Sequence, residues 1–375
     1  MSQADKQFFG LQTEQSKIKS LIVSKYFIAW ARIMLGARRL SSPYCVNKSI
    51  HYLELYCGPG EYDDGSVSTP LMVIDIASDH DKIARHLVMN MVDSDPEYCA
   101  LLEKRIGAHP RFSCLKHRPQ VTCGKVGSSL AAQLSGTRLV PTFLFADPWG
   151  YAGLSLDLFE AVLKDWGSEC VFFFNYNRIN AAITNAKVSH LIEDLLGKQQ
   201  AQALRATVPN MRPSQRERAV LASLDQAFQR EGQRYVQTFA FLAAGGARTS
   251  HYLVFVSKSY LGYRIMRQVM AKHSSNSVQG VPTMMYDPRD GIGHRLFEVG
   301  QPLEDLKRML LEDLAGSTIK VSKLIEKHSV GRPYIDKNYK TALWELHDGG
   351  EISASRSPCR KNTFADDIVV TFPQR

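Results

Sequence analysis

The pattern of apolar and polar positions along the first 270 residues alternates between strand-like runs and helix-like spacings. Continuous apolar runs predict strands at about 50–57, 87–93, 111–117, 141–148 and 169–176. Apolar residues at three- and four-residue steps predict helices at 14–40, 70–78, 96–106 and 154–163. Strands that alternate with helices of about ten residues are typical of a parallel, doubly wound α/β sheet.

Two further features follow the fifth predicted strand. Residues 177–230 show only helical patterns and exceed the length of a simple crossover, so they predict a helical insertion. Residues 235–242 and 251–257 read as the strands of a hairpin, and residues 260–271 read as a closing helix. Parallel strands followed by a hairpin form the strand plan of a Rossmann-like class I methyltransferase domain, which we expect over residues 49–273.

The two ends of the chain differ from this domain. Residues 1–48 predict an N-terminal helical segment, and residues 274–300, rich in Ser, Gly, Pro and Asp, predict a linker. Residues 301–375 contain helical patterns followed by a two-stranded ribbon, which predicts a winged helix. This segment holds twelve Lys and Arg against eleven acids, so DNA binding and protein docking both remain open for it.

Charge indicates the kind of partner. The net charge is +9, and residues 1–50 carry eight Lys and Arg against two acids. Residues 205–218 add four arginines against one glutamate. Basic segments beside an α/β domain favour nucleic acid as a partner, while a solvated helix face explains a charge of this size equally well.

Composition also bears on the compartment. The chain has no run of 18 or more apolar residues, and its first twelve residues lack the apolar region of a signal peptide. Its seven cysteines are odd in number and form no Cys-x-x-Cys pair, which fits reduced thiols. We therefore expect a soluble, cytoplasmic protein that does not enter a membrane.

Candidate cofactor-binding residues lie at the ends of the first two predicted strands. They are Glu54, Tyr56, Cys57, Gly58 and Gly60, around a Gly-x-Gly turn, and then Asp93 and Ser94. Glycines let the backbone approach a ligand closely, and a carboxylate can accept both ribose hydroxyls. Asp63 stands where the dinucleotide fingerprint needs its third glycine, which favours S-adenosylmethionine over a pyrophosphate cofactor. The alternative is that Asp93 belongs only to the cap of the next helix.

Candidate catalytic residues lie at the ends of the fourth and fifth predicted strands. They are Asp147, Pro148, Trp149, Asn175 and Arg178. An acid-Pro-aromatic turn can accept hydrogen bonds from an amino group and can stack its ring on a base. Asn175 can hydrogen-bond an amide or a base, and Arg178 can hold a phosphate. The alternatives are a plain turn with a buried tryptophan, and asparagines that cap the next helix.

Metal and thiol chemistry receive little support. His109, Cys114, His117 and Cys123 fall close together, but their spacing matches no common zinc pattern. We therefore predict no metal site. Cys57 has no histidine at a spacing that would indicate a nucleophilic pair, so covalent catalysis is a weak option.

Four motifs in order resemble the three-Cys-motif partner protein family. They are residues 53–65 with 68–71, then 145–151, 174–180 and 251–255. The resemblance covers about residues 14–270 and implies a fold like that of S-adenosylmethionine-dependent methyltransferases. It also implies a genomic partner whose three-cysteine motif resembles radical-SAM proteins. Family members often show Phe-Ala and Asp-Pro-Phe-Gly where this chain has Tyr56-Cys57 and Trp149.

The leading hypothesis is a methyltransferase that acts on an amino nitrogen of RNA or DNA, mainly by holding the acceptor in line with the methyl donor. The alternative from another class is a non-catalytic protein that keeps this fold within a defence or modification complex. A third option, a DNA-binding regulator acting through residues 301–375, is disfavoured by the near-neutral charge of that segment.

Overall fold

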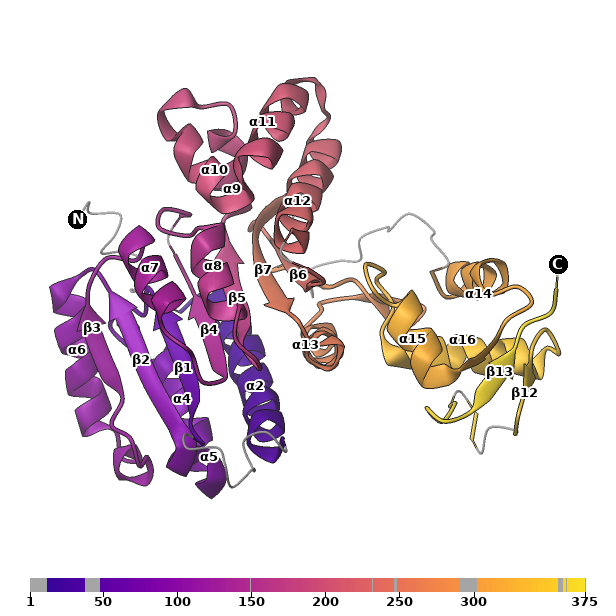
Figure 1. Ribbon diagram of the computed structural model, residues 1–375, viewed down its shortest axis with the longest axis horizontal. Coiled ribbons are helices and arrows are strands. Elements are labelled where there is room, and N and C mark those ends of the chain that lie inside the picture. Colours follow the sequence, from indigo (N-terminus) through magenta and orange to yellow (C-terminus); the bar gives the residue numbers. More distant parts are fainter. Residues whose placement is uncertain are drawn as a thin grey trace. The chain divides into compact units, whose positions relative to one another are not determined.

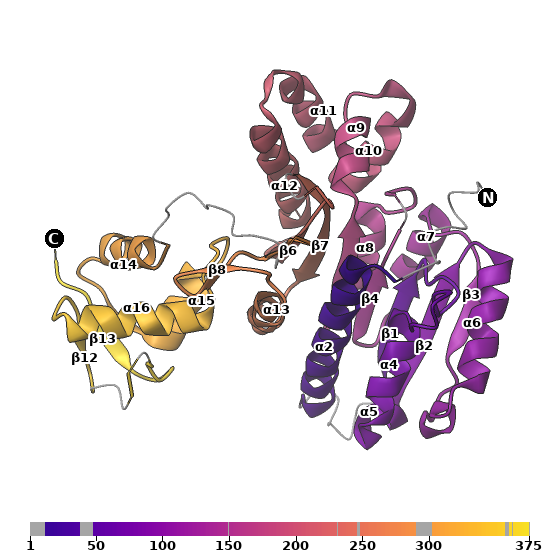
Figure 2. The ribbon, with the colours of Figure 1, turned by 180° about the vertical axis from the view of Figure 1, so that it is seen from behind.

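The computed structural model (Figures 1 and 2) describes residues 12–37, 48–148, 150–230, 232–245, 248–289, 302–356, 360–361 and 363–374. The chain divides into two units, residues 1–266 and residues 267–375. Within the described ranges, every helix is too short or too polar to span a bilayer.

A mixed sheet forms the centre of the first unit (Figure 1). Its strands within residues 1–266 are β1 (Ile50–Leu55), β2 (Leu87–Asp93), β3 (Gln120–Cys123), β4 (Thr142–Ala146), β5 (Glu169–Phe174), β6 (Tyr235–Leu242) and β7 (Thr249–Ser257). They lie in the order β6-β7-β5-β4-β1-β2-β3. Strands β1 to β5 run parallel, and β7 lies antiparallel between β5 and β6. This order confirms the predicted Rossmann-like sheet of the class I methyltransferase type.

Helices cover both faces of this sheet. They are α2 (Glu14–Gly36), α4 (Thr69–Ser78), α5 (Asp81–His86), α6 (Pro96–Ala108), α7 (Ser128–Gly136), α8 (Leu156–Leu163) and α13 (Tyr260–Lys272), which crosses the boundary between the units. In Figure 1, α7 and α8 lie in front of the sheet, and Figure 2 shows α2 and α4 on the opposite face. Because both faces are covered, the central strands are mostly apolar, and every residue of β4 is buried.

The N-terminal helix α2 belongs to the core of the first unit. Its Tyr26, Phe27 and Trp30 are almost completely buried. The ring of Phe27 lies 5.2 Å from that of Tyr52 and 5.8 Å from that of Phe143 on the sheet. Aromatic rings at such separations add to the stability that their buried area provides. Helix α2 is therefore an integral layer of this domain and not the separate segment that the sequence predicts.

The predicted third strand at 111–117 is wrong. Phe112–Cys114 form a short 3-10 helix, and the strand β3 begins at Gln120. Strand β3 lies at the edge of the sheet, and most of its side chains are exposed. An edge strand of this kind needs no continuous apolar run, so the sequence gives it little signal. The helices α5 and α7 were not predicted either.

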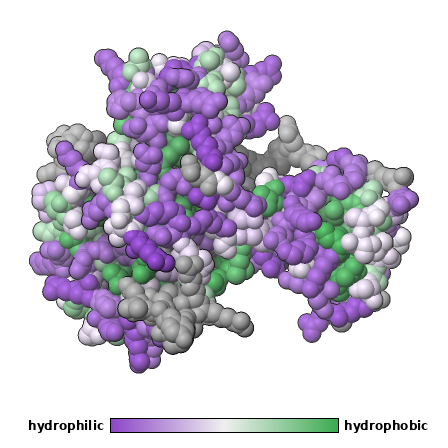
Figure 3. All heavy atoms as spheres, viewed as in Figure 1, coloured by the Kyte–Doolittle hydropathy of each residue, from purple (hydrophilic) through white to green (hydrophobic). Residues whose placement is uncertain are grey.

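The helical insertion leaves the sheet where β5 ends. It consists of α9 (Tyr176–Ala182), η2 (Ala186–Val188), α10 (Ser189–Leu196), α11 (Lys198–Thr207), η3 (Val208–Asn210) and α12 (Pro213–Gln229). Its helices bury a small apolar core of their own, which includes Ile192, Leu195, Leu204, Val220 and Leu224. Hydrophilic residues dominate its visible surface in Figure 3. Because β5 is parallel to β1 and β4, the insertion lies at the carboxyl ends of these strands.

The second unit contains a winged helix. Its elements are α14 (Pro302–Asp313), β11 (Thr318–Lys320), α15 (Val321–His328), α16 (Asp336–Asp348), β12 (Ser353–Ala354) and β13 (Val369–Thr371). The strands form an antiparallel sheet in the order β11-β13-β12. Leu306, Leu324, Leu343 and Val370 are fully or almost fully buried in the core that helices and sheet share. This confirms the predicted C-terminal winged helix.

The segment before the winged helix differs from the predicted linker. Its described part holds β8 (Ser277–Val278), β9 (Val281–Pro282) and β10 (Met285–Tyr286). The buried Arg267 donates hydrogen bonds to the backbone oxygens of Ser329 at 2.7 Å and Tyr334 at 2.6 Å. Charge-assisted bonds from one guanidinium to two carbonyls fix the turn between α15 and α16. The second unit thus begins at Arg267, before the predicted start of the linker.

The buried Glu169 makes the stability of the first unit depend on pH. Its carboxylate accepts hydrogen bonds from Tyr26 at 2.5 Å and Ser257 at 2.8 Å. Burial raises the pKa of Glu169 to about 7, against a usual value of 4.5. As the pH rises, Glu169 therefore loses its proton at a lower pH in the unfolded chain than in the folded protein. The free energy of unfolding falls by about 3 kcal/mol between pH 4.5 and 7 as a result.

We expect Glu169→Gln to remove this part of the pH dependence, because its amide does not titrate. Urea denaturation at pH 5 and at pH 8 measures the effect. At pH 8, Glu169→Gln should have a higher free energy of unfolding than wild type. Glu97→Gln, at an exposed position on α6, should match the stability of wild type at both pH values. If the stability of Glu169→Gln falls between pH 5 and pH 8 as much as that of wild type, Glu169 is not the source of this pH dependence.

Candidate functional site

A cavity of about 430 Å³ opens where β1, β2 and β4 end. The register pairs Leu55 of β1 with Val92 of β2 and with Ala146 of β4, so the carboxyl ends of the three strands lie at one level. Six of the seven predicted cofactor-binding residues line this cavity. They are Glu54, Tyr56, Cys57, Gly58, Asp93 and Ser94. This is the place where nucleotide-like ligands bind in doubly wound sheets.

The carboxylate of Asp93 ties together two loops at the cavity. Its Oδ2 accepts a hydrogen bond from the backbone N–H of Gly58 at 2.9 Å, and its Oδ1 accepts one from that of Asp95 at 3.0 Å. Gly58 has a φ of 63°, a left-handed conformation that glycine adopts without strain. Each carboxylate oxygen has two lone pairs, so Asp93 retains acceptor capacity for a ligand. The cap of α6 is made by Asp95, whose side chain accepts from Glu97 and Tyr98.

Gly60 does not line the cavity. Its φ is 91°, and a Cβ at this position would come within 2.7 Å of Leu102 on α6. The glycine therefore permits a close approach between the loop and α6. Gly60 thus packs against α6, whereas Gly58 is the glycine that lines the cavity.

Glu54 lies almost completely buried in the wall of the cavity, with 2% of its surface exposed. The hydroxyl of Tyr52 donates to its Oε2 at 2.5 Å. Burial raises the pKa of Glu54 well above its usual value, an effect that this hydrogen bond and the charge of Lys19 oppose. A cation bound in the cavity would lower that pKa again.

A buried ion pair joins α2 to the end of β4. Lys19 donates to Oδ2 of Asp147, and its side chain is only 4% exposed. Burial alone would lower the pKa of Lys19, but the neighbouring Asp147 raises it above its usual value, so the lysine is charged. Sequence reasoning missed Lys19. Its signal is a lysine on the same helical face as the apolar Ile22 and Val23.

A second cavity, of about 350 Å³, adjoins the first and shares Asp147 and Pro148 with it. The other predicted catalytic residues that line it are Asn175 and Arg178, and it also contains Phe173, Asn177 and His251. Trp149 lies outside the described residues. The amide oxygen of Asn175 accepts from the backbone N–H of Arg178 at 3.1 Å and so caps α9. Asn175 therefore has the helix-capping role that the sequence predicts as the alternative to a role in the site.

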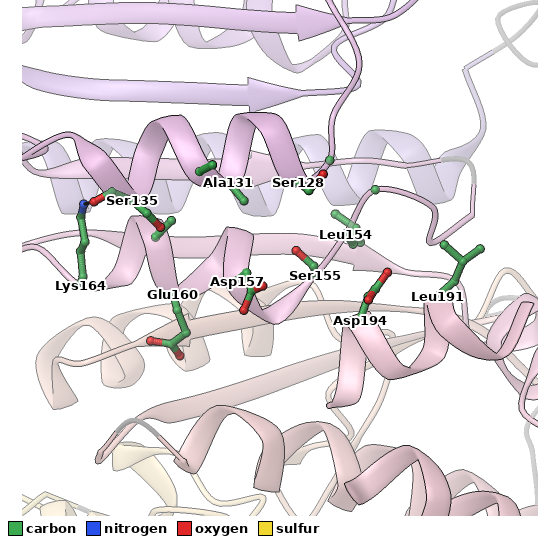
Figure 4. Close-up of a pocket in the computed structure, with 14 residues that line it drawn as sticks. Ser128, Ala131, Ser135, Leu154, Ser155, Asp157, Glu160, Lys164, Leu191 and Asp194 are labelled. Carbon is green, nitrogen blue, oxygen red and sulfur yellow. Dashed lines mark hydrogen bonds between the residues drawn. The ribbon is translucent and has the colours of Figure 1, made fainter. Parts of the chain in front are cut away.

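A third cavity, of about 600 Å³, lies between α7, α8 and α10 (Figure 4). Asp157 and Glu160 project from α8, and Asp194 projects from α10. Glu160 forms an ion pair with Arg234 at 2.8 Å, and Lys164 donates to backbone oxygens at the end of α7. None of the predicted site residues lines this groove. Lys164 thus links the end of α8 to α7, and Glu160 links α8 to the residue before β6, in the largest of the three cavities.

The four residues considered for a metal do not form a common site. His109 lies 3.4 Å from Asp75, and Cys114 and Cys123 are exposed. Among the residues that the structure describes, no group of three or more His, Cys, Asp or Glu side chains is placed to hold a metal ion.

Comparison with known proteins bears on both units. Residues 285–358 match the family of the GMT-like wHTH domain. This match and the observed elements agree on a winged helix at the C-terminus. No curated protein sequence matches the chain.

Solved structures similar to this chain include methyltransferases. An O-methyltransferase from Bacillus cereus, in complex with SAH, is 13% identical and has a TM-score of 0.33, over 63% of this chain and 90% of that one. The O-methyltransferase TomG from Streptomyces achromogenes, in complex with SAM, is 11% identical and has a TM-score of 0.31, over 68% and 95%. The glycopeptide N-methyltransferase MtfA, with sinefungin, is 13% identical and has a TM-score of 0.30, over 61% and 85%. With scores this low, the strand order, and not these likenesses, establishes the fold.

Proposed function

We propose that the first unit is an S-adenosylmethionine-dependent methyltransferase that acts on an amino nitrogen of nucleic acid. The observation that carries this proposal is the pair of adjoining cavities at the carboxyl ends of the parallel strands, which share the wall made by Asp147 and Pro148. A methyl donor and a methyl acceptor need two such sites with a common boundary, because the transfer is in line and direct.

The groups of the first cavity fit the cofactor. The carboxylate of Asp93 can accept the ribose hydroxyls, and Glu54 can balance a cation. The hydroxyl of Ser68, which also lines the cavity, is buried and has no hydrogen-bond partner within the described part of the chain. A buried polar group in that state favours a ligand that pairs with it. Bound S-adenosylmethionine would supply an electrophilic methyl group on a sulfonium.

The second cavity fits an acceptor amine. Lys19 fixes Asp147 through Oδ2, which leaves Oδ1 to accept a hydrogen bond from an amino group. Arg178 is exposed at the same cavity and can hold a phosphate. These residues orient the nitrogen lone pair toward the first cavity. Positioning of this kind supplies much of the catalysis of a direct transfer.

Charge favours nucleic acid over other acceptors. Residues 176–230, at the carboxyl ends of the strands, hold eight Lys and Arg against four acids. Several of these cations are exposed, namely Arg178, Lys187, Lys198, Arg212 and Arg218. Residues 301–375, by contrast, hold twelve Lys and Arg against eleven acids, so their net charge is close to zero. The insertion therefore offers the more attractive surface for a phosphate backbone.

The test is methyl transfer from S-adenosylmethionine labelled in its methyl group to total RNA and to duplex DNA. We expect acid-insoluble label that S-adenosylhomocysteine suppresses, and nuclease digestion identifies which nucleic acid carries it. Hydrolysis to bases should place the label on an amino nitrogen. Binding of the cofactor without transfer to either nucleic acid would contradict the proposed function.

A second candidate is a non-catalytic methyltransferase-like partner protein. The observation in its favour is that two predicted catalytic groups already serve the fold, since Asp147 binds Lys19 and Asn175 caps α9. The resemblance to three-Cys-motif partner proteins would make a three-cysteine-motif protein its binding partner. An Asp147→Ala variant that folds and still supports the partner complex would favour this function.

A further inference from the structure

His251 occupies a defined place at the second cavity. It stands near the start of β7, where its neighbour Tyr252 pairs with Phe174 at the end of β5. His251 therefore lies beside the point at which Asn175 begins α9. Its side chain lines the cavity together with Asp147, Asn177 and Arg178. No role in the site was predicted for this histidine from the sequence.

The imidazole is held in one orientation by an aromatic neighbour. Its ring stacks on that of Phe173, with ring centres 4.6 Å apart and an angle of 13° between the planes. The ammonium of Lys19 lies 4.7 Å from the centre of the same phenyl ring. The stacking and the cation–π contact both favour this orientation of the ring.

One ring nitrogen of His251 is left without a partner. Its Nδ1 is buried and has no hydrogen bond to any of the described residues. A buried nitrogen in this condition is costly for the folded protein. Nδ1 has almost no surface open to solvent, so a ligand that enters the second cavity and displaces the atoms covering this nitrogen would supply the missing hydrogen bond.

The surroundings also set the charge of the ring. Burial, followed by the positive charge of Lys19, lowers the pKa of His251 to about 4, and Arg178 acts in the same direction while Asp147 opposes it. The ring is therefore neutral at physiological pH. A neutral imidazole carries one acceptor nitrogen, which is the form that the unpaired Nδ1 needs.

We propose that Nδ1 of His251 accepts a hydrogen bond from the amine in the second cavity and takes the proton that this amine loses on methylation. The inference rests on the proposed function. The nitrogen lone pair forms the new N–C bond, the C–S bond breaks with its electron pair going to sulfur, and one N–H proton passes to Nδ1. Water at the mouth of the cavity then removes that proton.

The weakness of this base indicates the class of acceptor. A lysine side chain is an ammonium at neutral pH, and both its entry beside Lys19 and Arg178 and its deprotonation by a neutral imidazole there are unfavourable. The exocyclic amine of a base is already neutral, and its methylated cation is a strong acid that gives up a proton to a weak base. His251 thus fits an aromatic amine and not a lysine side chain.

The test compares two substitutions of His251 with one control. His251→Phe keeps a ring against Phe173 but removes the nitrogen, and His251→Asn keeps a hydrogen-bond acceptor near Nδ1. We expect kcat to fall roughly 100- to 10,000-fold in His251→Phe, and less in His251→Asn, while S-adenosylmethionine affinity stays within about twofold of wild type in both. His86→Phe, at the end of α5 and therefore at the opposite edge of the sheet from both cavities, should keep the wild-type rate.

A second readout does not depend on turnover. In wild-type protein the Nδ1 nitrogen resonance of His251 should shift when an unlabelled oligonucleotide acceptor is added with S-adenosylhomocysteine. A wild-type rate in His251→Phe, or an unshifted Nδ1 resonance, would overturn the proposal for His251 alone. Methyl transfer to a lysine peptide and not to nucleic acid would overturn the proposed acceptor class. Absence of any transfer by wild type would instead count against the proposed function.

Discussion

Replacement of Lys19 by Met is expected to lower the free energy of unfolding of the first unit by roughly 3–5 kcal/mol. The substitution leaves Asp147, whose side chain is 22% exposed, without its counter-ion at the end of a fully buried strand. Removal of one partner from a buried pair costs far more than the pair contributes, because the remaining charge must lose its water without compensation. Chemical denaturation of the variant and wild type measures the difference.

Two further variants separate the ion pair from general damage to α2. Lys17→Met removes an exposed lysine from the same helix and should change the stability by no more than about 0.5 kcal/mol. Lys19→Met combined with Asp147→Asn should recover most of the loss, because no buried charge remains unpaired. If Lys19→Met is as stable as Lys17→Met, the ion pair does not have the importance that we assign to it.

The second large effect concerns Asp93. We expect Asp93→Ala to weaken S-adenosylmethionine binding about 100-fold, which corresponds to about 2.7 kcal/mol. The substitution removes the acceptor for the backbone N–H of Gly58 and the proposed contact with the ribose. A hydrogen bond to a charged acceptor contributes roughly 1.5–3 kcal/mol, so the loss of the ribose contact alone accounts for the effect.

Calorimetric titration of the cofactor measures this change. Asp79→Ala is the matched control, because Asp79 is an exposed acid paired with Arg111 at 2.5 Å and does not line the cavity. It should bind as wild type does. Wild-type affinity in Asp93→Ala would remove Asp93 from the cofactor site.

The sheet could be predicted because its strands are buried. Strands β2, β4 and β5 are mostly apolar, since helices cover both faces, and an acid or an asparagine marks the end of each. Strand β3 could not be found in this way because it is an edge strand with exposed side chains. The helix α2 was predicted, but its place in the core depends on contacts with Tyr52 and Phe143 that are distant in sequence.

The candidate site could be predicted only where it follows strand ends. Gly58, Asp93, Asp147 and Arg178 lie at such ends, and the parallel register brings them to one edge. Lys19 and His251 lie on other elements, and nothing in their own sequence neighbourhood shows that they face Asp147 or the second cavity. Tertiary packing alone brings these two residues to the site.

The most direct test of the two-cavity account is a crystal structure of the protein with S-adenosylhomocysteine. We predict that the adenosine occupies the cavity of about 430 Å³, with its ribose hydroxyls at Asp93, the amino-acid end near Glu54, and the sulfur directed toward Asp147 and Pro148. Two results would contradict the proposal that this unit is a methyltransferase. One is that the ligand binds instead in the groove between α7, α8 and α10, and the other is that no ligand binds at millimolar concentration.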